Sequence, residues 1–162
     1  MIIRKATLKD AKRIAEIYNQ GISEHIATLE TTLRDTKERE EWLSQRDSRH
    51  PVFVAEYRSS VVGWASINVF NTREVYKYVG DISVYIDKNM RGKGIGKLLL
   101  QTLEKKAKQL KFHKLVIAGF PFNTPAVALY TKVGYKKVGI YEEQGLLDGE
   151  WVDVLLMEKI LA

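Results

Sequence analysis

The chain has 162 residues, 45% of them hydrophobic and 28% charged, which is enough for one domain with a buried core and excludes a disordered protein. It has no cysteine, which excludes disulfide bonds and thiol chemistry, and its three histidines lack the spacing of a metal site. The net charge of +6 indicates an anionic partner, such as a nucleotide cofactor, a nucleic acid or a membrane surface. With no apolar run of membrane-spanning length and no signal peptide, we expect a cytoplasmic protein.

The first half of the chain alternates between strand and helix patterns. Period-two segments predict four strands, at 2–6, 51–57, 61–70 and 78–87. A capping box from Thr7 to Asp10 opens a first helix, and Asp35 is expected to cap a second, mostly charged helix at 36–45. The strand at 78–87 is apolar on both faces, which predicts a central place in the sheet.

The second half continues the alternation. A helix follows Gly94, and its expected apolar face consists of Ile95, Leu98, Leu99, Leu103, Ala107 and Leu110. A strand is predicted at 114–119, and a further helix begins with Thr124 as the expected cap. A hairpin around Asp148-Gly149 ends the chain. We therefore predict one α/β domain over residues 1–162, with a mixed sheet that is antiparallel early and parallel around 91–97.

The stretch from Arg91 to Lys97 carries three glycines and three cations in seven residues, directly after a strand and before a helix. Free N–H groups and the helix dipole favour an anion at such a helix start, and glycine lets the backbone approach a phosphate. The glycine spacing fits neither the dinucleotide-binding G-x-G-x-x-G motif nor the Walker loop. The alternative is a flexible turn with solvated cations.

The sequence Arg91-Gly92-Lys93-Gly94-Ile95-Gly96 resembles the R/Q-x-x-G-x-G/A loop of the GNAT acetyltransferases. The resemblance covers nearly the whole chain, because 3–22 and 123–139 are also similar to family segments. A narrower set of segments resembles the phosphinothricin acetyltransferase subfamily, and within it the branch related to arsinothricin resistance: 17–31, 50–56, 61–67, 83–87 and 138–154. The resemblance implies one mostly antiparallel mixed sheet of about six or seven strands, about four flanking helices, and a splayed parallel strand pair at an acetyl-CoA site.

The resemblance also implies which residues hold acetyl-CoA. Backbone amides of residues 91–97, called the glycine loop from here on, would bind the pyrophosphate of acetyl-CoA. The strand before the loop would pair with the pantetheine arm. The implied set is Val84, Tyr85, Ile86, Arg91, Gly92, Lys93, Gly94, Ile95, Gly96, Lys97 and Asn123. For Lys105, Lys106 and Lys108 a solvated helix face is expected, with the adenosine 3′-phosphate as the alternative ligand.

The implied chemistry is transfer of an acetyl group from a thioester to an amine, with no metal. Such an amine must lose a proton before attack. Asp81 lies where the subfamily has a glutamate as general base, so the role passes to a side chain one methylene shorter; the alternatives are a positioning carboxylate or a solvated one. Tyr130 lies where many family members place the tyrosine that protonates the thiolate; the alternative is a core aromatic.

The expected acceptor is a small amino-acid analogue such as phosphinothricin, methionine sulfoximine or arsinothricin. Glu30 would bind its ammonium group, with Arg73 and Tyr76 at its acid group, and solvated loop positions are the alternative. Phe122 stands where the branch usually has a glutamate, so the resemblance does not fix the identity of the substrate.

Other possible acceptors are a polyamine, an aminoglycoside or a protein N-terminus. A remote alternative is a non-enzymatic module that binds acyl-CoA or nucleic acid. We expect a homodimer that binds neither nucleic acid nor membrane.

Overall fold

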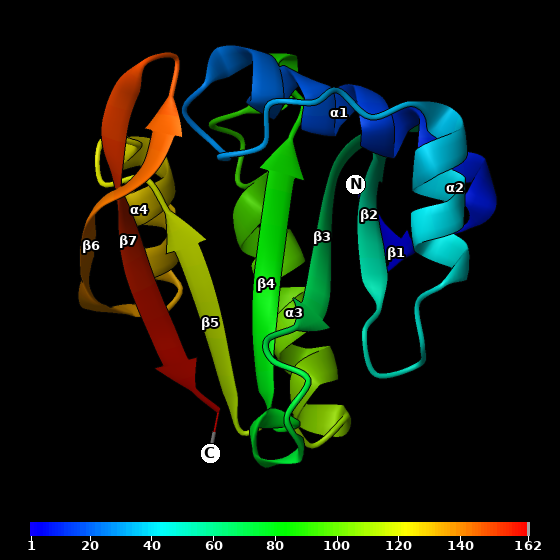
Figure 1. Ribbon diagram of the computed structural model, residues 1–162. Coiled ribbons are helices and arrows are strands. Elements are labelled where there is room, and N and C mark those ends of the chain that lie inside the picture. Colours follow the sequence, from blue (N-terminus) through cyan, green and yellow to red (C-terminus); the bar gives the residue numbers. More distant parts are fainter. Residues whose placement is uncertain (162) are drawn as a thin grey trace.

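Seven strands form one mixed sheet in the computed structural model, which describes residues 1–161 (Figure 1). The strand order is β1-β2-β3-β4-β5-β7-β6, and every neighbouring pair is antiparallel except β4 and β5. The strands are β1 (Ile2–Lys5), β2 (Val52–Tyr57), β3 (Ser60–Val69), β4 (Val79–Ile86), β5 (Lys114–Gly119), β6 (Lys136–Leu147) and β7 (Glu150–Ile160). The expected mixed sheet and the central place of β4 are confirmed.

Four α-helices cover the two faces of the sheet. They are α1 (Ala11–Glu24), α2 (Thr36–Ser44), α3 (Ile95–Gln109) and α4 (Thr124–Lys132), with 3-10 turns at Leu8–Asp10, Glu74–Tyr76 and Lys88–Met90. Apolar residues of α3 and α4 share one buried cluster, while those of α1 and α2 pack in a second cluster on the other face. Within residues 1–161, no helix is long and apolar enough to cross a membrane.

Local signals placed two of the three expected Ser/Thr/Asp helix caps correctly, and α3 follows Gly94 as expected. The Thr7 amide donates to the Asp10 carboxylate at 2.8 Å, as the capping box predicts, although the first turn is 3-10 and α1 begins at Ala11. Asp35 accepts the amide of Glu38 at 2.8 Å at the start of α2. The expected cap Thr124 was wrong by one residue, because it is already helical and Asn123 occupies the N-cap position of α4.

The apolar face of α3 supplies much of the larger cluster. Leu99 and Leu103 are fully buried, but Leu98, which was assigned to this face, is 43% exposed. Leu100 is buried in its place. The buried stripe of α3 runs through Ile95, Leu99, Leu103 and Ala107 and widens to the side of Leu100, which the helical period alone could not reveal.

The parallel pairing of β4 and β5 is short. Val79, Gly80 and Asp81 pair with 114–116, and no later residue of β4 in the described chain pairs with β5. The two strands then diverge toward α1 and α4 (Figure 1). Backbone N–H and C=O groups along this opening lack sheet partners, so the sheet offers an edge in its interior to an extended ligand.

Adjacent leucines of α3 provide a test of this packing. We expect Leu99→Ala to lower the free energy of unfolding by about 3 kcal/mol, because it removes fully buried methyl groups and leaves a cavity. Leu98→Ala, the matched control, should cost less than about 1 kcal/mol. Urea unfolding of both variants measures the difference, and equal losses would contradict the assigned orientation of α3.

Candidate active site

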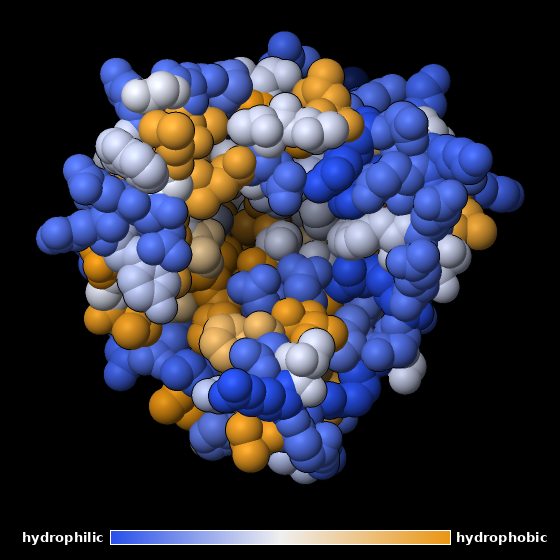
Figure 2. Space-filling model, in the orientation of Figure 1, coloured by the Kyte–Doolittle hydropathy of each residue, from blue (hydrophilic) through white to orange (hydrophobic). Residues whose placement is uncertain are grey.

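A cavity of about 400 Å³ lies where β4 and β5 diverge. The space-filling view shows the sheet face hollowed near its centre, with hydrophobic atoms around the hollow (Figure 2). Nearly all residues predicted to bind acetyl-CoA line the cavity: Val84, Tyr85, Ile86, Arg91, Gly92, Gly94, Ile95, Gly96, Lys97 and Asn123. Lys93 is the exception, and its ammonium group lies 3.8 Å from the sulfur of Met90. The walls come from segments far apart in the sequence.

The glycine loop forms one end of the cavity. Gly92 and Gly94 have positive φ angles of 76° and 82°, and Gly94 is the N-cap of α3. A Cβ on either would meet no atom within 4 Å, so the backbone conformation, not crowding, requires glycine there. The first amides of α3 have no intrahelical acceptor and face the cavity end. These donors, together with Lys97, suit the pyrophosphate of a nucleotide coenzyme.

Arg91 is held by α1. Its guanidinium donates two hydrogen bonds to the carboxylate of Glu24, at 2.6 and 2.7 Å. These bonds lower the pKa of Glu24. The side chain of Arg91 therefore fixes the glycine loop to the end of α1, and its charge is already matched. Glu24 was not predicted as a site residue, because nothing in the local sequence links it to a loop 67 residues away.

Asp81 lies at the base of the wedge, in the last residue pair before β4 and β5 separate. It is half-buried, and its burial raises its pKa to about 6. Successive side chains of a strand point to opposite faces, so Asp81, Ser83 and Tyr85 face α1 and α2, whereas Ile82 and Val84 face α3. Ser83 and Tyr85 line the cavity, whereas Asp81 lies on the same face but outside the lining residues.

A partly buried polar network surrounds Asn68, the residue of β3 that pairs with Asp81. Asn68 favours the charged carboxylate of Asp81 and so lowers its pKa, which opposes the effect of burial. Arg46 donates to the Asn68 side-chain oxygen at 2.9 Å, as does the hydroxyl of fully buried Ser66 at 3.0 Å, while the Asn68 amide donates to Ser83 at 3.0 Å. The amide orientation of Asn68 is therefore fixed. Sequence reasoning missed this network, since Arg46 follows α2 in a loop.

Tyr130 reaches the cavity from α4. Burial raises its pKa to about 12, so the phenol is protonated at neutral pH and can act as a proton donor. Phe122, the departure from the branch pattern, is 52% exposed and stacks on Phe120, which lines the cavity, with ring centroids 5.0 Å apart. Tyr130 therefore comes from α4, whereas Phe120 and Phe122 lie in the turn between β5 and α4.

The three predicted acceptor residues do not meet within one chain. Glu30 is exposed and accepts a hydrogen bond from Arg34 at 3.1 Å, in the segment after α1. Arg73 and Tyr76 line a separate hollow of about 160 Å³ beside the start of β4. Because the start and end of β4 are roughly 25 Å apart, one small molecule cannot bridge them in a single subunit.

The segment after α1 covers part of the cavity. Its Ile26 and Ala27 line the cavity, and the Asn123 side chain donates to the Ile26 carbonyl at 3.2 Å. Leu29 packs closely on Gly145 of β6, where a Cβ would lie 2.7 Å from a Leu29 methyl group. The segment therefore connects α1 to α4 and to the C-terminal hairpin.

A glycine loop at the start of α3, placed at the end of a wedge between parallel strands, suits a ligand that carries a nucleotide. A family model described as the acetyltransferase (GNAT) family matches residues 13–135, and the chain belongs to this family. It is 30% identical to the L-methionine sulfoximine/L-methionine sulfone acetyltransferase of Pseudomonas aeruginosa, over 96% of this chain and 92% of the relative. The family and fold expected from the sequence are confirmed.

Two solved structures show the same architecture. The ribosomal-protein-alanine N-acetyltransferase of Brucella melitensis is 35% identical with a TM-score of 0.95, over 99% of both chains. A phosphinothricin acetyltransferase of Sinorhizobium meliloti, solved in complex with acetyl-CoA, is 29% identical with a TM-score of 0.93, over 99% of this chain and 88% of that one. The roles of individual site residues and the single-domain assignment stay predictions.

The raised pKa of Asp81 predicts a pH-dependent stability difference. The fold favours the neutral acid, so this group contributes stability below its ordinary pKa of 3.8 that is lost as the pH rises through about 6. The Asp81→Asn variant has no group that ionises at this position, so it does not lose this stability as the pH rises. Relative to wild type, we expect the variant to gain at most roughly 3 kcal/mol in the free energy of unfolding between pH 4 and pH 8.

Chemical denaturation across this pH range measures the effect. Glu41→Gln, which changes an exposed carboxylate of α2, is the control and should show no such trend. A difference between Asp81→Asn and wild type that stays constant with pH would contradict the raised pKa.

Proposed function

We propose that the protein is an acetyl-CoA-dependent N-acetyltransferase for the amino group of a small amino-acid analogue, such as phosphinothricin, methionine sulfoximine or arsinothricin. The position of Asp81 carries the proposal, since a half-buried carboxylate with a raised pKa ends the strand pairing at the base of the wedge. Groups of this kind concentrate at functional sites. The names of the Pseudomonas and Sinorhizobium relatives support the acceptor class.

The cavity residues fit the coenzyme. Backbone groups of Val84 and Ile86 line the interior edge of β4 and would hold an extended pantetheine arm as a strand holds its neighbour. The amides from Arg91 to Lys97 would hold the pyrophosphate, with Asn123 and Tyr85 beside the arm. Acetyl-CoA supplies the acetyl group as an activated thioester. The chain itself supplies binding, orientation and proton transfer.

Asp81 is proposed as the general base. Its carboxylate would accept a proton from the substrate ammonium group, which frees the nitrogen lone pair for attack, and would later release that proton to solvent. A pKa of about 6 leaves Asp81 charged at neutral pH and makes it a stronger base than an ordinary aspartate. Asn68, whose orientation Arg46 fixes, would hold the carboxylate in place.

Tyr130 is proposed as the general acid. Its protonated phenol would donate to the leaving thiolate and recover a proton from solvent. Glu30 would bind the substrate ammonium group, in competition with its bond to Arg34. Arg73 and Tyr76 would bind an acid group of the substrate. Because they lie far from Glu30 of the same chain, they would reach a substrate that is bound in the other subunit of a dimer.

Thiol release tests the proposal. With acetyl-CoA, we expect rapid release in the presence of phosphinothricin or methionine sulfoximine, and a loss of roughly 100-fold to 10,000-fold in Asp81→Ala. The wild-type rate should fall as the pH drops below about 6, because Asp81 then becomes protonated. Glu41→Ala, in an exposed carboxylate of α2, should keep the wild-type rate. Release that is unaffected in Asp81→Ala would remove Asp81 as the base.

A protein N-terminus is the second candidate acceptor. The Brucella structure, named for N-acetylation of a ribosomal-protein alanine, has the higher identity of the two solved structures compared here. The same assay with a peptide that begins with alanine separates the two candidates. Release with the peptide alone would contradict the amino-acid analogue as substrate and keep the enzyme class.

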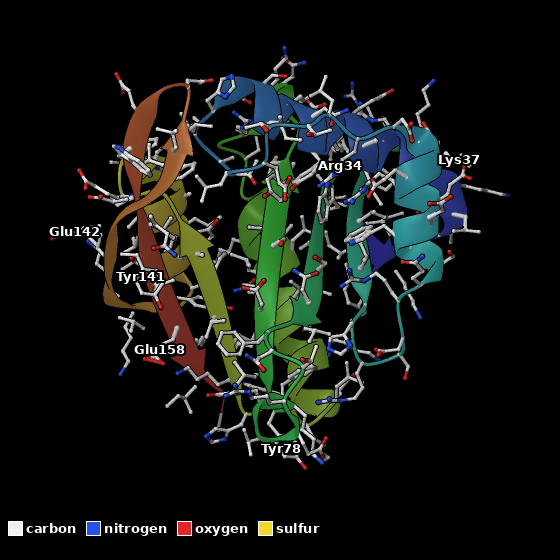
Figure 3. The ribbon with its side chains drawn as sticks, viewed as in Figure 1. Arg34, Lys37, Tyr78, Tyr141, Glu142 and Glu158 are labelled. Carbon is white, nitrogen blue, oxygen red and sulfur yellow. The ribbon has the colours of Figure 1, made fainter. Side chains whose placement is uncertain are left out.

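We further propose that the protein is a homodimer joined through β6 and β7. The strand β6 is a twelve-residue edge of the sheet, and a long exposed edge invites pairing with another chain. Tyr141 and Glu142 lie along this edge (Figure 3). The hairpin exposes more than half of each of six large apolar side chains: Val138, Ile140, Tyr141, Leu146, Trp151 and Ile160.

The cytoplasmic location expected from the sequence also stays a prediction.

Light scattering after size exclusion tests the dimer. Wild type should elute at twice the chain mass of 18.6 kDa. Trp151 is 62% exposed, and Trp151→Lys should weaken the dimer by roughly 30-fold. Leu8→Lys, in a residue that is 54% exposed far from the hairpin, is the control. A wild-type monomer, or an equal effect of the two variants, would refute this interface.

A further inference from the structure

Ser83 is a residue of β4 that lines the coenzyme cavity, and it has no part in the proposed base and acid steps. It lies two residues after Asp81 and two before Tyr85, so all three side chains share the strand face that is turned toward α1 and α2. Residues two apart on a strand are separated by roughly 7 Å. Ser83 is therefore the next side chain on this face after the proposed base, on the way to the end of β4.

Arg46 fixes the direction of a chain of hydrogen bonds that ends at Ser83. A guanidinium group can only donate, so the Asn68 atom that lies 2.9 Å from Arg46 is the amide oxygen. The buried hydroxyl of Ser66 donates to the same oxygen at 3.0 Å. The NH2 group of Asn68 must then face Ser83, and the Ser83 hydroxyl oxygen accepts its hydrogen bond at 3.0 Å.

The one proton of the Ser83 hydroxyl remains for a different acceptor, because the NH2 group of Asn68 cannot take it. Among residues 1–161, no group accepts a hydrogen bond from Ser83, and the side chain that lowers the pKa of Asp81 is Asn68. The chain of bonds begins at a cation, and each bond polarises the next, which makes the Ser83 hydroxyl a stronger donor. A polarised hydroxyl with an unused proton beside the cavity suits an oxygen atom of the ligand.

We propose that the Ser83 hydroxyl donates a hydrogen bond to the carbonyl oxygen of the acetyl thioester, an inference that rests on the proposed function. The pyrophosphate would lie at the glycine loop, and the pantetheine arm would pair with Val84 and Ile86. The thioester end of the arm is then directed back along β4 toward Asp81. Ser83 lies between Asp81 and the residues that hold the arm, which is where the reacting carbonyl has to be.

The hydrogen bond acts on the oxygen that gains charge during acetyl transfer. After Asp81 takes one ammonium proton, the nitrogen lone pair forms a bond to the carbonyl carbon, and the π electrons of the C=O bond move onto oxygen. Ser83 keeps its proton and stabilises that negative charge. The C=O bond then re-forms, the C–S bond breaks with its electron pair on sulfur, and the thiolate takes the proton of Tyr130. The nitrogen loses its surplus proton to solvent, from which Tyr130 regains one.

Infrared difference spectroscopy tests the hydrogen bond without an acceptor present, with acetyl-CoA isotopically labelled at the carbonyl carbon. The C=O stretch should move to lower frequency on binding to wild type, because a hydrogen bond weakens the double bond. Ser83→Ala should still bind acetyl-CoA but lose much of this shift, and Ser83→Thr, which keeps a hydroxyl group, should restore it. Ser44→Ala, in an exposed serine of α2, is the control and should show the wild-type shift.

Thiol release with methionine sulfoximine gives the second readout. Ser83→Ala should lower kcat roughly 100-fold, the cost of losing one donor to a developing oxyanion. The KM of the acceptor should stay as in wild type, and the rate should still fall below about pH 6, because Asp81 is intact.

Two results would overturn the role of Ser83 and leave the proposed acetyltransferase intact: an unchanged stretch in Ser83→Ala, or a raised acceptor KM with an unchanged kcat. Failure of wild type to bind acetyl-CoA would overturn the role of Ser83 and the proposed function together. A shift that Ser83→Ala loses, in a wild type that releases no thiol with any amino-acid analogue, would keep the Ser83 hydrogen bond and remove the proposed acceptor class.

Discussion

The early end of the β4–β5 pairing is the constraint on which the rest of the site depends. A parallel pair that stops after three residues leaves peptide groups unpaired inside the sheet, which is unfavourable unless another group satisfies them. The wedge persists because α3 and α4 pack behind it and share the larger apolar cluster with both strands. The proposed coenzyme would fill this opening by bonding to the backbone edge of β4, and the glycine loop would then meet its charged end.

Charge is distributed around this wedge in a way that favours backbone recognition. Arg91, the first cation of the glycine loop, is neutralised by Glu24 and anchors the loop to α1. The loop therefore offers mainly oriented amides, whose positions are fixed by α3, and leaves uncompensated charge to lysines farther along the helix. Fixed backbone dipoles at the loop would orient the proposed coenzyme, whereas lysine charges farther along α3 would add attraction.

The chemistry of Asp81 depends on neighbours from other strands and loops. Burial at the base of the wedge raises its pKa, and Asn68 opposes that shift by favouring the charged form. Arg46 and Ser66 hold the amide of Asn68 in one orientation. The side chain of aspartate is short, so the reach of Asp81 toward the proposed acceptor would depend strongly on this support. Removing Arg46 would leave polar groups unpaired beside Asp81.

The sequence by itself determined the features that arise within a few residues: the capping box at Thr7, the cap at Asp35 and the hairpin turn at Asp148. It also predicts an anion site at the glycine loop. Similarity over the whole chain added the family and its sheet. Tertiary structure alone decided that Leu98 faces solvent, that Glu24 holds Arg91, that Arg46 supports Asn68, and that Glu30 lies far from Arg73. These contacts join residues distant in the chain, and local periodicity carries no information about which distant segments a fold brings together.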